Sequence, residues 1–114
     1  MPVNVFIVLS NPPEDISAET FSAFYDLHAR QILELPAFVA AERFALQFVR
    51  GTSDAPPRFS HYVRYEIEGD FDEAWKQLRA AVDSGRIDLP NWFPRVHTEG
   101  WHGSSLGGRV MAGT

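Results

Sequence analysis

Residues 19–38, ETFSAFYDLHARQILELPAF, carry the pattern that decides the fold of this chain. Apolar residues recur there at three- and four-residue spacing, which predicts an amphipathic helix over residues 19–35. Its core-facing stripe consists of Phe21, Phe24, Ile32 and Leu35. Ser17 can cap the start of this helix with its side-chain oxygen, and Pro36 ends it because the proline ring clashes with the preceding turn.

The segments on both sides of this helix predict a four-stranded antiparallel sheet. Strands alternate in side-chain direction and are rich in β-branched and aromatic residues, and Asp70 can cap a second helix. The expected elements are strands at residues 3–9, 38–49, 59–68 and 96–110 and a second helix at residues 71–84. The order β-α-β-β-α-β predicts an α+β, ferredoxin-like protomer with both helices on one face of the sheet. The other face is then open and partly apolar, which favours a symmetric dimer.

His28 lies on the apolar stripe of the first helix, four residues after Phe24 and four before Ile32. A buried imidazole needs a hydrogen-bond partner or it carries a desolvation cost. His28 is therefore either a satisfied core residue or a reactive group at the floor of a pocket. Tyr25 can share the same cavity, or it is a core aromatic.

The third strand places two candidate binding residues on one face. His61 and Tyr65 point the same way as the apolar residues of that strand and can approach His28. Arg64 and Glu66 point to the opposite, open face, and the alternation of the second strand predicts that Arg43 joins them there. These three charged residues either form a cross-strand ion-pair network, or the arginine binds a substrate carboxylate or phenolate.

Composition excludes several classes of protein. The 114 residues predict one domain, residues 1–114, with a tail from about residue 103 that is extended or exchanged between protomers. The net charge of −5 and the single lysine argue against a nucleic-acid or anionic-membrane partner, and no apolar run is long enough to span a bilayer. The start of the chain lacks a basic region, so we expect no export, and the absence of cysteine fits the cytoplasm.

The remaining histidines do not predict a metal site. His97 and His102 are separated by five positions, and alternation along a strand sends them to opposite faces. Zinc ligands must converge on one point. We therefore expect no metal.

Three stretches together resemble the EthD-like branch of the dimeric α+β barrel superfamily. They are VFIVLSNP at residues 5–12, YDLHARQILELPAF at residues 25–38 and AAERF at residues 40–44. That branch usually has glycine after the proline of the helix-ending turn, where this chain has Ala37. The resemblance implies a homodimer whose two sheets pack into a barrel, with a substrate pocket between each sheet and its own helices and no cofactor. In several such proteins a histidine that matches His28 takes part in proton transfer.

The resemblance leaves three functions open. The first is a dehydratase or isomerase that acts by proton transfer on a small cyclic, phenolic or polyketide-like substrate. The second is a non-catalytic dimeric binding module in which His28 is structural, and the third is a cofactorless oxygenase of the same barrel type. For an enzyme, His28 is the expected catalytic residue. The expected substrate-binding residues are Phe24, Tyr25, Arg43, His61 and Tyr65.

Overall fold

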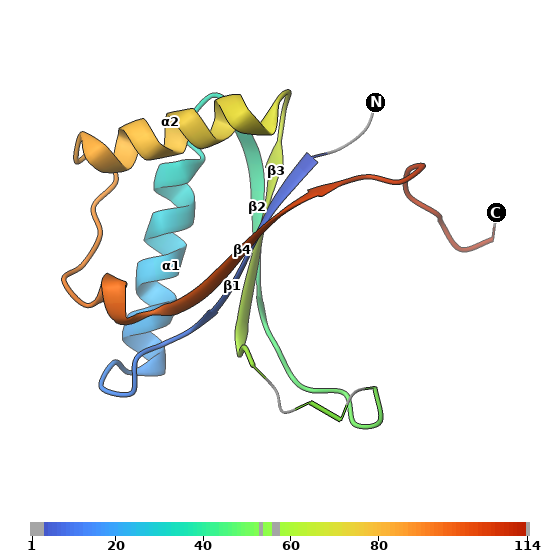
Figure 1. Cartoon of the computed structure of the whole chain (residues 1–114), viewed down its shortest axis with the longest axis horizontal. Helices are drawn as coiled ribbons and strands as arrows, with labels where there is room; N and C mark the ends of the chain where they lie inside the picture. The colour runs from blue at the N-terminus through green and yellow to red at the C-terminus, as the bar shows by residue number, and fades with distance from the viewer. Residues whose placement is uncertain (1–3, 53, 56–57, 114) are drawn as a thin grey trace.

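The computed structural model describes residues 4–52, 54–55 and 58–113. Its elements are β1 (Asn4–Asn11), α1 (Ala18–Ile32), β2 (Phe38–Ala45), β3 (His61–Ile67), α2 (Phe71–Asp83), a short 3-10 helix η1 (Phe93–Arg95) and β4 (His97–Ser104). The strands form one antiparallel sheet in the order β2-β3-β1-β4. Figure 1 shows α1 and α2 on the same side of this sheet. The predicted ferredoxin-like α+β architecture is confirmed.

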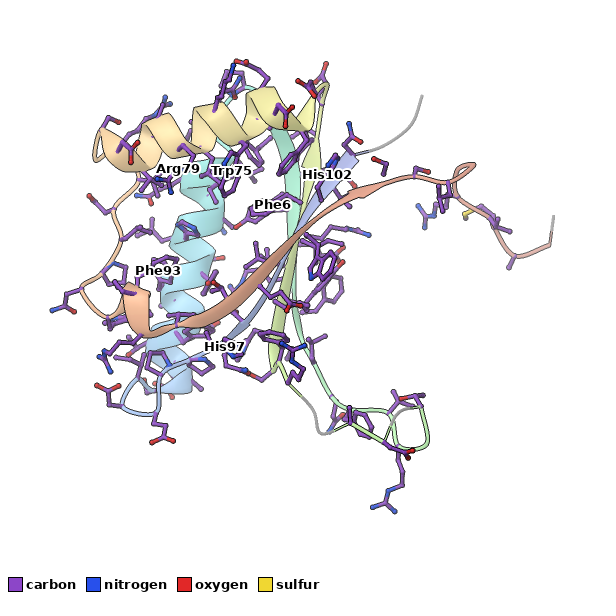
Figure 2. The ribbon with its side chains drawn as sticks, in the orientation of Figure 1. Phe6, Trp75, Arg79, Phe93, His97 and His102 are labelled. Carbon is purple, nitrogen blue, oxygen red and sulfur yellow. The ribbon has the colours of Figure 1, made fainter. Side chains whose placement is uncertain are left out.

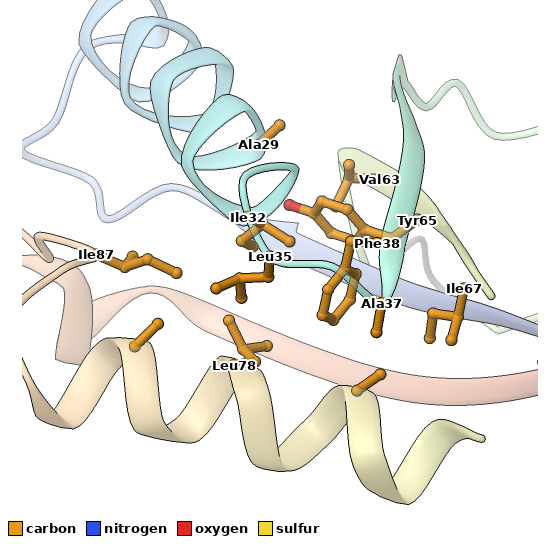
Figure 3. Packing of buried hydrophobic residues seen from close by; sticks show 12 residues of the cluster. Ala29, Ile32, Leu35, Ala37, Phe38, Val63, Tyr65, Ile67, Leu78 and Ile87 are labelled. Atoms are coloured by element: carbon orange, nitrogen blue, oxygen red, sulfur yellow. The ribbon is translucent and has the colours of Figure 1, made fainter. Parts of the chain in front are cut away.

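The main core lies between the sheet and the facing sides of the two helices (Figure 3). Ile32 of α1, Leu78 of α2 and Tyr65 of β3 are buried within it. A smaller cluster surrounds Phe21 and Tyr25 in the first half of α1, where Val96 packs against them. The apolar stripe predicted for the first helix therefore reaches both clusters.

The helix ends follow local chemistry, with one exception. The Ser17 side chain caps α1 by accepting a hydrogen bond from the Thr20 amide at 3.1 Å, as predicted. Asp70 occupies the corresponding position before α2, but its side chain makes no capping hydrogen bond within the described chain. The prediction that Asp70 caps α2 through its side chain is wrong. Gly85 has a positive φ of 80° just after α2, a conformation that glycine adopts without a steric penalty.

The second and last strands are shorter than their sequence patterns predict. β2 ends at Ala45, which pairs with His61 at the start of β3. One further backbone bond joins the Leu46 amide to the Ser60 carbonyl, and beyond it β2 has no ladder partner in the described residues. β4 ends at Ser104, which pairs with Asn4 at the start of β1. Each strand thus stops where its partner begins, a limit set by pairing rather than by the strand's own sequence.

A β-bulge in β2 changes which side chains face the helices. Phe38 pairs with Ile67 and Ala41 pairs with Tyr65, so β2 has one residue more than β3 over the same interval. Strict alternation would put Phe38 and Arg43 on opposite faces. Because of the bulge both lie on the helix-facing side, and Arg43 pairs with the buried Val63. The prediction that Arg43 joins Arg64 on the open face is wrong.

Arg64 remains on the open face, where its guanidinium donates to Glu42 of the neighbouring strand at 3.2 Å. Both side chains are exposed, so this ion pair contributes at most about 1 kcal/mol. The same face carries an apolar row from β1, in which Ile7 pairs with Arg64 on one side and with Trp101 on the other.

In the described residues, no helix is long and apolar enough to cross a bilayer.

Candidate functional site

A pocket of about 570 Å³ lies between the two helices and the helix-facing side of the sheet. Apolar and aromatic side chains supply most of its wall, among them Phe6 and Val8 of β1, Phe71 and Leu78 of α2, and Phe93 of η1. Its polar or titratable side chains are Tyr25, His28, Tyr65, Arg79, Thr98 and His102. A concave, apolar pocket with a few polar groups is the usual form of a small-molecule site.

His28 reaches this pocket from the middle of α1. Its ring stacks on Phe24 at a centroid distance of 5.1 Å and meets the edge of Tyr25 at 5.8 Å. Burial among these rings lowers the pKa of His28 from 6.5 to about 4, so the imidazole is neutral at physiological pH. Its Nδ1 atom is buried and has no hydrogen-bond partner among the described residues. His28 is therefore a neutral imidazole with an unused polar atom, in contrast to a satisfied core histidine.

Tyr65 and Tyr25 lie beside His28 at the inner end of the pocket. Tyr65 is 1% exposed and Tyr25 is 6% exposed. The Tyr65 hydroxyl is buried without a partner in the described part of the chain, whereas the Tyr25 hydroxyl hydrogen-bonds Ser10. Burial raises the pKa of both phenols, so both stay protonated and able to donate. The pocket thus joins a neutral imidazole to two phenolic donors.

The outer part of the pocket is formed by α2 and β4. Figure 2 shows Trp75 and Arg79 along the edge of α2, and His102 near the end at which α2 begins. Trp75 of α2 is 43% exposed, so an aromatic ring borders the opening. The His102 ring stacks on Phe71 at 4.3 Å with nearly parallel planes. Much of the Trp75 ring contacts solvent.

Two of the predicted substrate-binding residues line a different cavity. His61 and Arg43 face a second hollow of about 290 Å³, against the first half of α1. Tyr25 borders both hollows. Phe24 lines neither hollow. Its ring stacks on the His28 ring and meets the Trp92 ring edge-on at a centroid distance of 5.2 Å. The structure therefore brings Tyr25, His28 and Tyr65 together in one pocket, and Arg43 and His61 line a second hollow that shares Tyr25 with it.

The other two histidines lie on β4, outside the group formed by Tyr25, His28 and Tyr65. His97 stacks on Phe59 at 5.0 Å, and the alternation of β4 places it on the face opposite His102. Across the described ranges, no three His, Asp or Glu side chains gather closely enough to hold a metal ion.

Most of the residues of the outer pocket are not marked by any pattern in the sequence. Arg79, Thr98 and Gly100 contribute to it from elements that are distant in sequence from His28. Gly100 is the exception, because a glycine inside a strand often marks a close approach of another group. A Cβ at this position would lie 3.3 Å from the Phe6 ring. Arg79 follows Phe71 and Trp75 at four-residue spacing, at the edge of the apolar face of α2, but a charged residue there does not by itself predict a pocket wall.

The sequence matches no protein-family model, and no curated protein is significantly similar to it. Solved structures do match. An ethyl tert-butyl ether D (EthD) family protein from Bacillus halodurans superposes with a TM-score of 0.58 at 13% identity, covering 93% of this chain and 100% of that one. SnoaB, a cofactor-independent oxygenase from Streptomyces nogalater, gives 0.56 at 13% identity with 97% of both chains covered. HapK from Hahella chejuensis gives 0.54 at 17% identity, with 99% and 100% covered. The resemblance to the EthD-like branch is confirmed at the level of the fold.

Proposed function

We propose that this protein is a cofactor-independent enzyme that moves a proton on a small, flat, largely apolar substrate bound between α1, α2 and the sheet. The observation that carries the proposal is the pair of buried polar atoms, His28 Nδ1 and the Tyr65 hydroxyl, which lack partners in the described residues beside a largely apolar pocket. A structural core rarely leaves two such atoms unpaired, because each costs about 1–3 kcal/mol. A substrate oxygen or acidic C–H that meets them would recover part of that cost.

The roles follow from the protonation states. At neutral pH His28 has a free lone pair and can accept a proton from an acidic carbon or hydroxyl of the substrate. The anion that forms is then next to the new imidazolium, and this opposite charge raises the pKa of His28 during the step. Tyr65 and Tyr25 remain protonated and can donate hydrogen bonds to the developing enolate or phenolate oxygen.

Two fates of such an anion define two reactions. Return of the proton from His28 to another position of the substrate makes the enzyme an isomerase, and its transfer to a hydroxyl group that leaves as water makes it a dehydratase, in both cases on a cyclic, phenolic or polyketide-like compound. The alternative is oxygenation, in which the deprotonated substrate itself supplies the electrons that reduce O₂. The fold shared with SnoaB, described as a cofactor-independent oxygenase, favours including this second reaction.

Proton transfer can be measured without knowing the natural substrate. The probe is 2-tetralone, a flat bicyclic ketone with an acidic C–H, and the assay is exchange of that hydrogen for deuterium followed by NMR. We expect the protein to accelerate exchange and His28→Gln to lower the rate by about 10²–10⁴-fold, the usual contribution of a positioned base. The matched control is His97→Gln, which removes an exposed histidine that does not line the pocket and should keep the rate.

Each possible result has a clear meaning. Oxygen uptake during the same incubation would assign the oxygenase reaction, and exchange without uptake would assign the isomerase or dehydratase class. Saturable binding of 2-tetralone with no exchange above background would contradict the enzyme and support a binding module with a structural His28. A folded His28→Gln variant with unchanged exchange would remove His28 as the base.

We also propose that two copies pair through the open face of the sheet. This face is crossed by the apolar row of β1, and Phe44 and Trp101 remain 40% and 58% exposed on it. An exposed apolar face of a sheet is typical of an interface. Light scattering should give twice the 12.9 kDa protomer mass, and a stable monomer at micromolar concentration would contradict the dimer.

A further inference from the structure

The second cavity, of about 290 Å³, lies between the first half of α1 and the paired strands β2 and β3. Its wall combines aromatic rings with a cation. Phe21 and Tyr25 of α1 and His61 of β3 supply the rings, and Arg43 of β2 supplies the charge. The function proposed above uses neither Arg43 nor this cavity.

Arg43 is fixed in place with its charge only partly compensated. Its guanidinium donates to the Ser22 hydroxyl at 2.8 Å, and 29% of its side chain is exposed. The nearest carboxylate, Asp26, is 3.9 Å away and also forms a closer pair with Arg30 at 3.1 Å. One carboxylate is thus shared between two arginines. A second anion beside Arg43 would be electrostatically favourable.

His61 stands in the same cavity with its tautomer fixed by a chain of hydrogen bonds. The Asn11 amide group donates to the Arg58 carbonyl, so the Asn11 oxygen is the acceptor for both the Ser60 amide at 2.9 Å and the Ser60 hydroxyl at 3.0 Å. Because the Ser60 hydroxyl hydrogen is used there, its oxygen accepts from Nδ1 of His61 at 2.8 Å. The proton of neutral His61 therefore sits on Nδ1, and Nε2 carries the lone pair.

This chain has a consequence for ligand binding. The Nε2 atom can take up a proton and become a second donor when an anion arrives. Burial and the charge of Arg43 lower the pKa of His61 in the protein alone, and a bound anion would offset both effects. Arg43 and His61 then act together, one as a permanent cation and the other as a cation formed on binding.

We propose that this cavity binds a small monocarboxylate with an apolar body of benzoate size, held by Arg43 and His61 through its carboxylate and by Phe21 and Tyr25 through its ring. The planar guanidinium matches the two oxygens of a carboxylate. The cavity is about half as large as the His28 pocket, which limits the apolar body to a single ring. The site is separate from the proposed reaction, although Tyr25 forms part of both walls.

Benzoate titration followed by NMR of the ¹⁵N-labelled histidine rings tests the site directly. We expect a saturable change at His61, and much weaker binding of benzyl alcohol, which keeps the ring but lacks the charge. Arg43→Gln should weaken benzoate binding at least tenfold, because it removes charge-assisted hydrogen bonds. The matched control Arg64→Gln alters an arginine on the open face and should bind benzoate as the unaltered protein does.

Several results would overturn the proposal. They are equal binding of benzyl alcohol and benzoate, unchanged affinity in folded Arg43→Gln, or an equal loss in Arg64→Gln. If Arg43→Gln fails to fold by circular dichroism, Arg43→Lys keeps the charge and replaces it as the test, with weaker binding expected because the planar fork is lost. His28→Gln should retain benzoate binding, so failure of this site and failure of the proposed reaction are distinguishable.

Discussion

Acidification is expected to destabilise this protein through His28. In the unfolded chain an imidazole binds a proton as the pH falls through about 6.5, whereas in the folded protein burial lowers the pKa of His28 to about 4. Between these two values the unfolded state binds more protons than the folded state. The free energy of unfolding therefore decreases as the pH falls across this window.

The size of the effect follows from the two pKa values. The full difference corresponds to about 3 kcal/mol, lost between neutral pH and pH 4. Most aspartates and glutamates begin to titrate at the acidic end, so the useful interval is pH 7 to pH 5. Over that interval the His28 contribution is about 2 kcal/mol per protomer.

Urea unfolding at fixed protein concentration, followed by circular dichroism at pH 7, 6 and 5, measures this contribution. His28→Gln removes the titrating group, so its stability should fall by about 2 kcal/mol less than that of the unaltered protein. His61 also has a lowered pKa, but it is present in both proteins and its effect cancels in the difference. His97→Gln serves as the control and should follow the unaltered protein. Parallel pH profiles for the unaltered protein and His28→Gln would refute the argument that His28 is buried and neutral.

Three further changes test single contacts, each by urea unfolding. Tyr65→Phe removes a buried hydroxyl that has no partner in the described chain, so the free energy of unfolding should stay equal or rise by up to about 1 kcal/mol. A decrease of more than about 1 kcal/mol would mean that the hydroxyl is hydrogen-bonded. Phe21→Ala empties a fully buried position between α1 and η1 and should cost about 3–5 kcal/mol, whereas a cost below about 1 kcal/mol would contradict its packing. Ser17→Ala should cost about 1 kcal/mol, with Ser17→Asp restoring most of it through the same cap; an unaffected Ser17→Ala would rule out the cap.

The position of His28 could be predicted from sequence because it depends on one helix. The stripe from Phe21 to Leu35 has the helical period, and a helix with that stripe must turn His28 toward the sheet. Burial of the imidazole beside Tyr25 follows from local geometry alone. The α+β order could be predicted for a similar reason, since each strand and helix has its own period.

The position of Arg43 could not be predicted in this way. Its face depends on the bulge between Phe38 and Ala40, where the register of β2 against β3 shifts. Nothing in the alternating letters of β2 marks this shift, because Val39, Ala40 and Ala41 fit either face equally well. A change of one residue in register sends every later side chain to the other side of the sheet.

That single shift determines the chemistry of the helix-facing side. Without the bulge, Arg43 would lie beside Arg64 on the open face, and His61 would have no cation next to it. With the bulge, the helix-facing side has two hollows, a largely apolar one at His28 and a second one that contains Arg43. Tyr25 borders both hollows and stays protonated, because burial raises the pKa of its phenol. The irregular step in β2 therefore places the cation of the proposed carboxylate site, whereas the position of His28 depends on α1 alone.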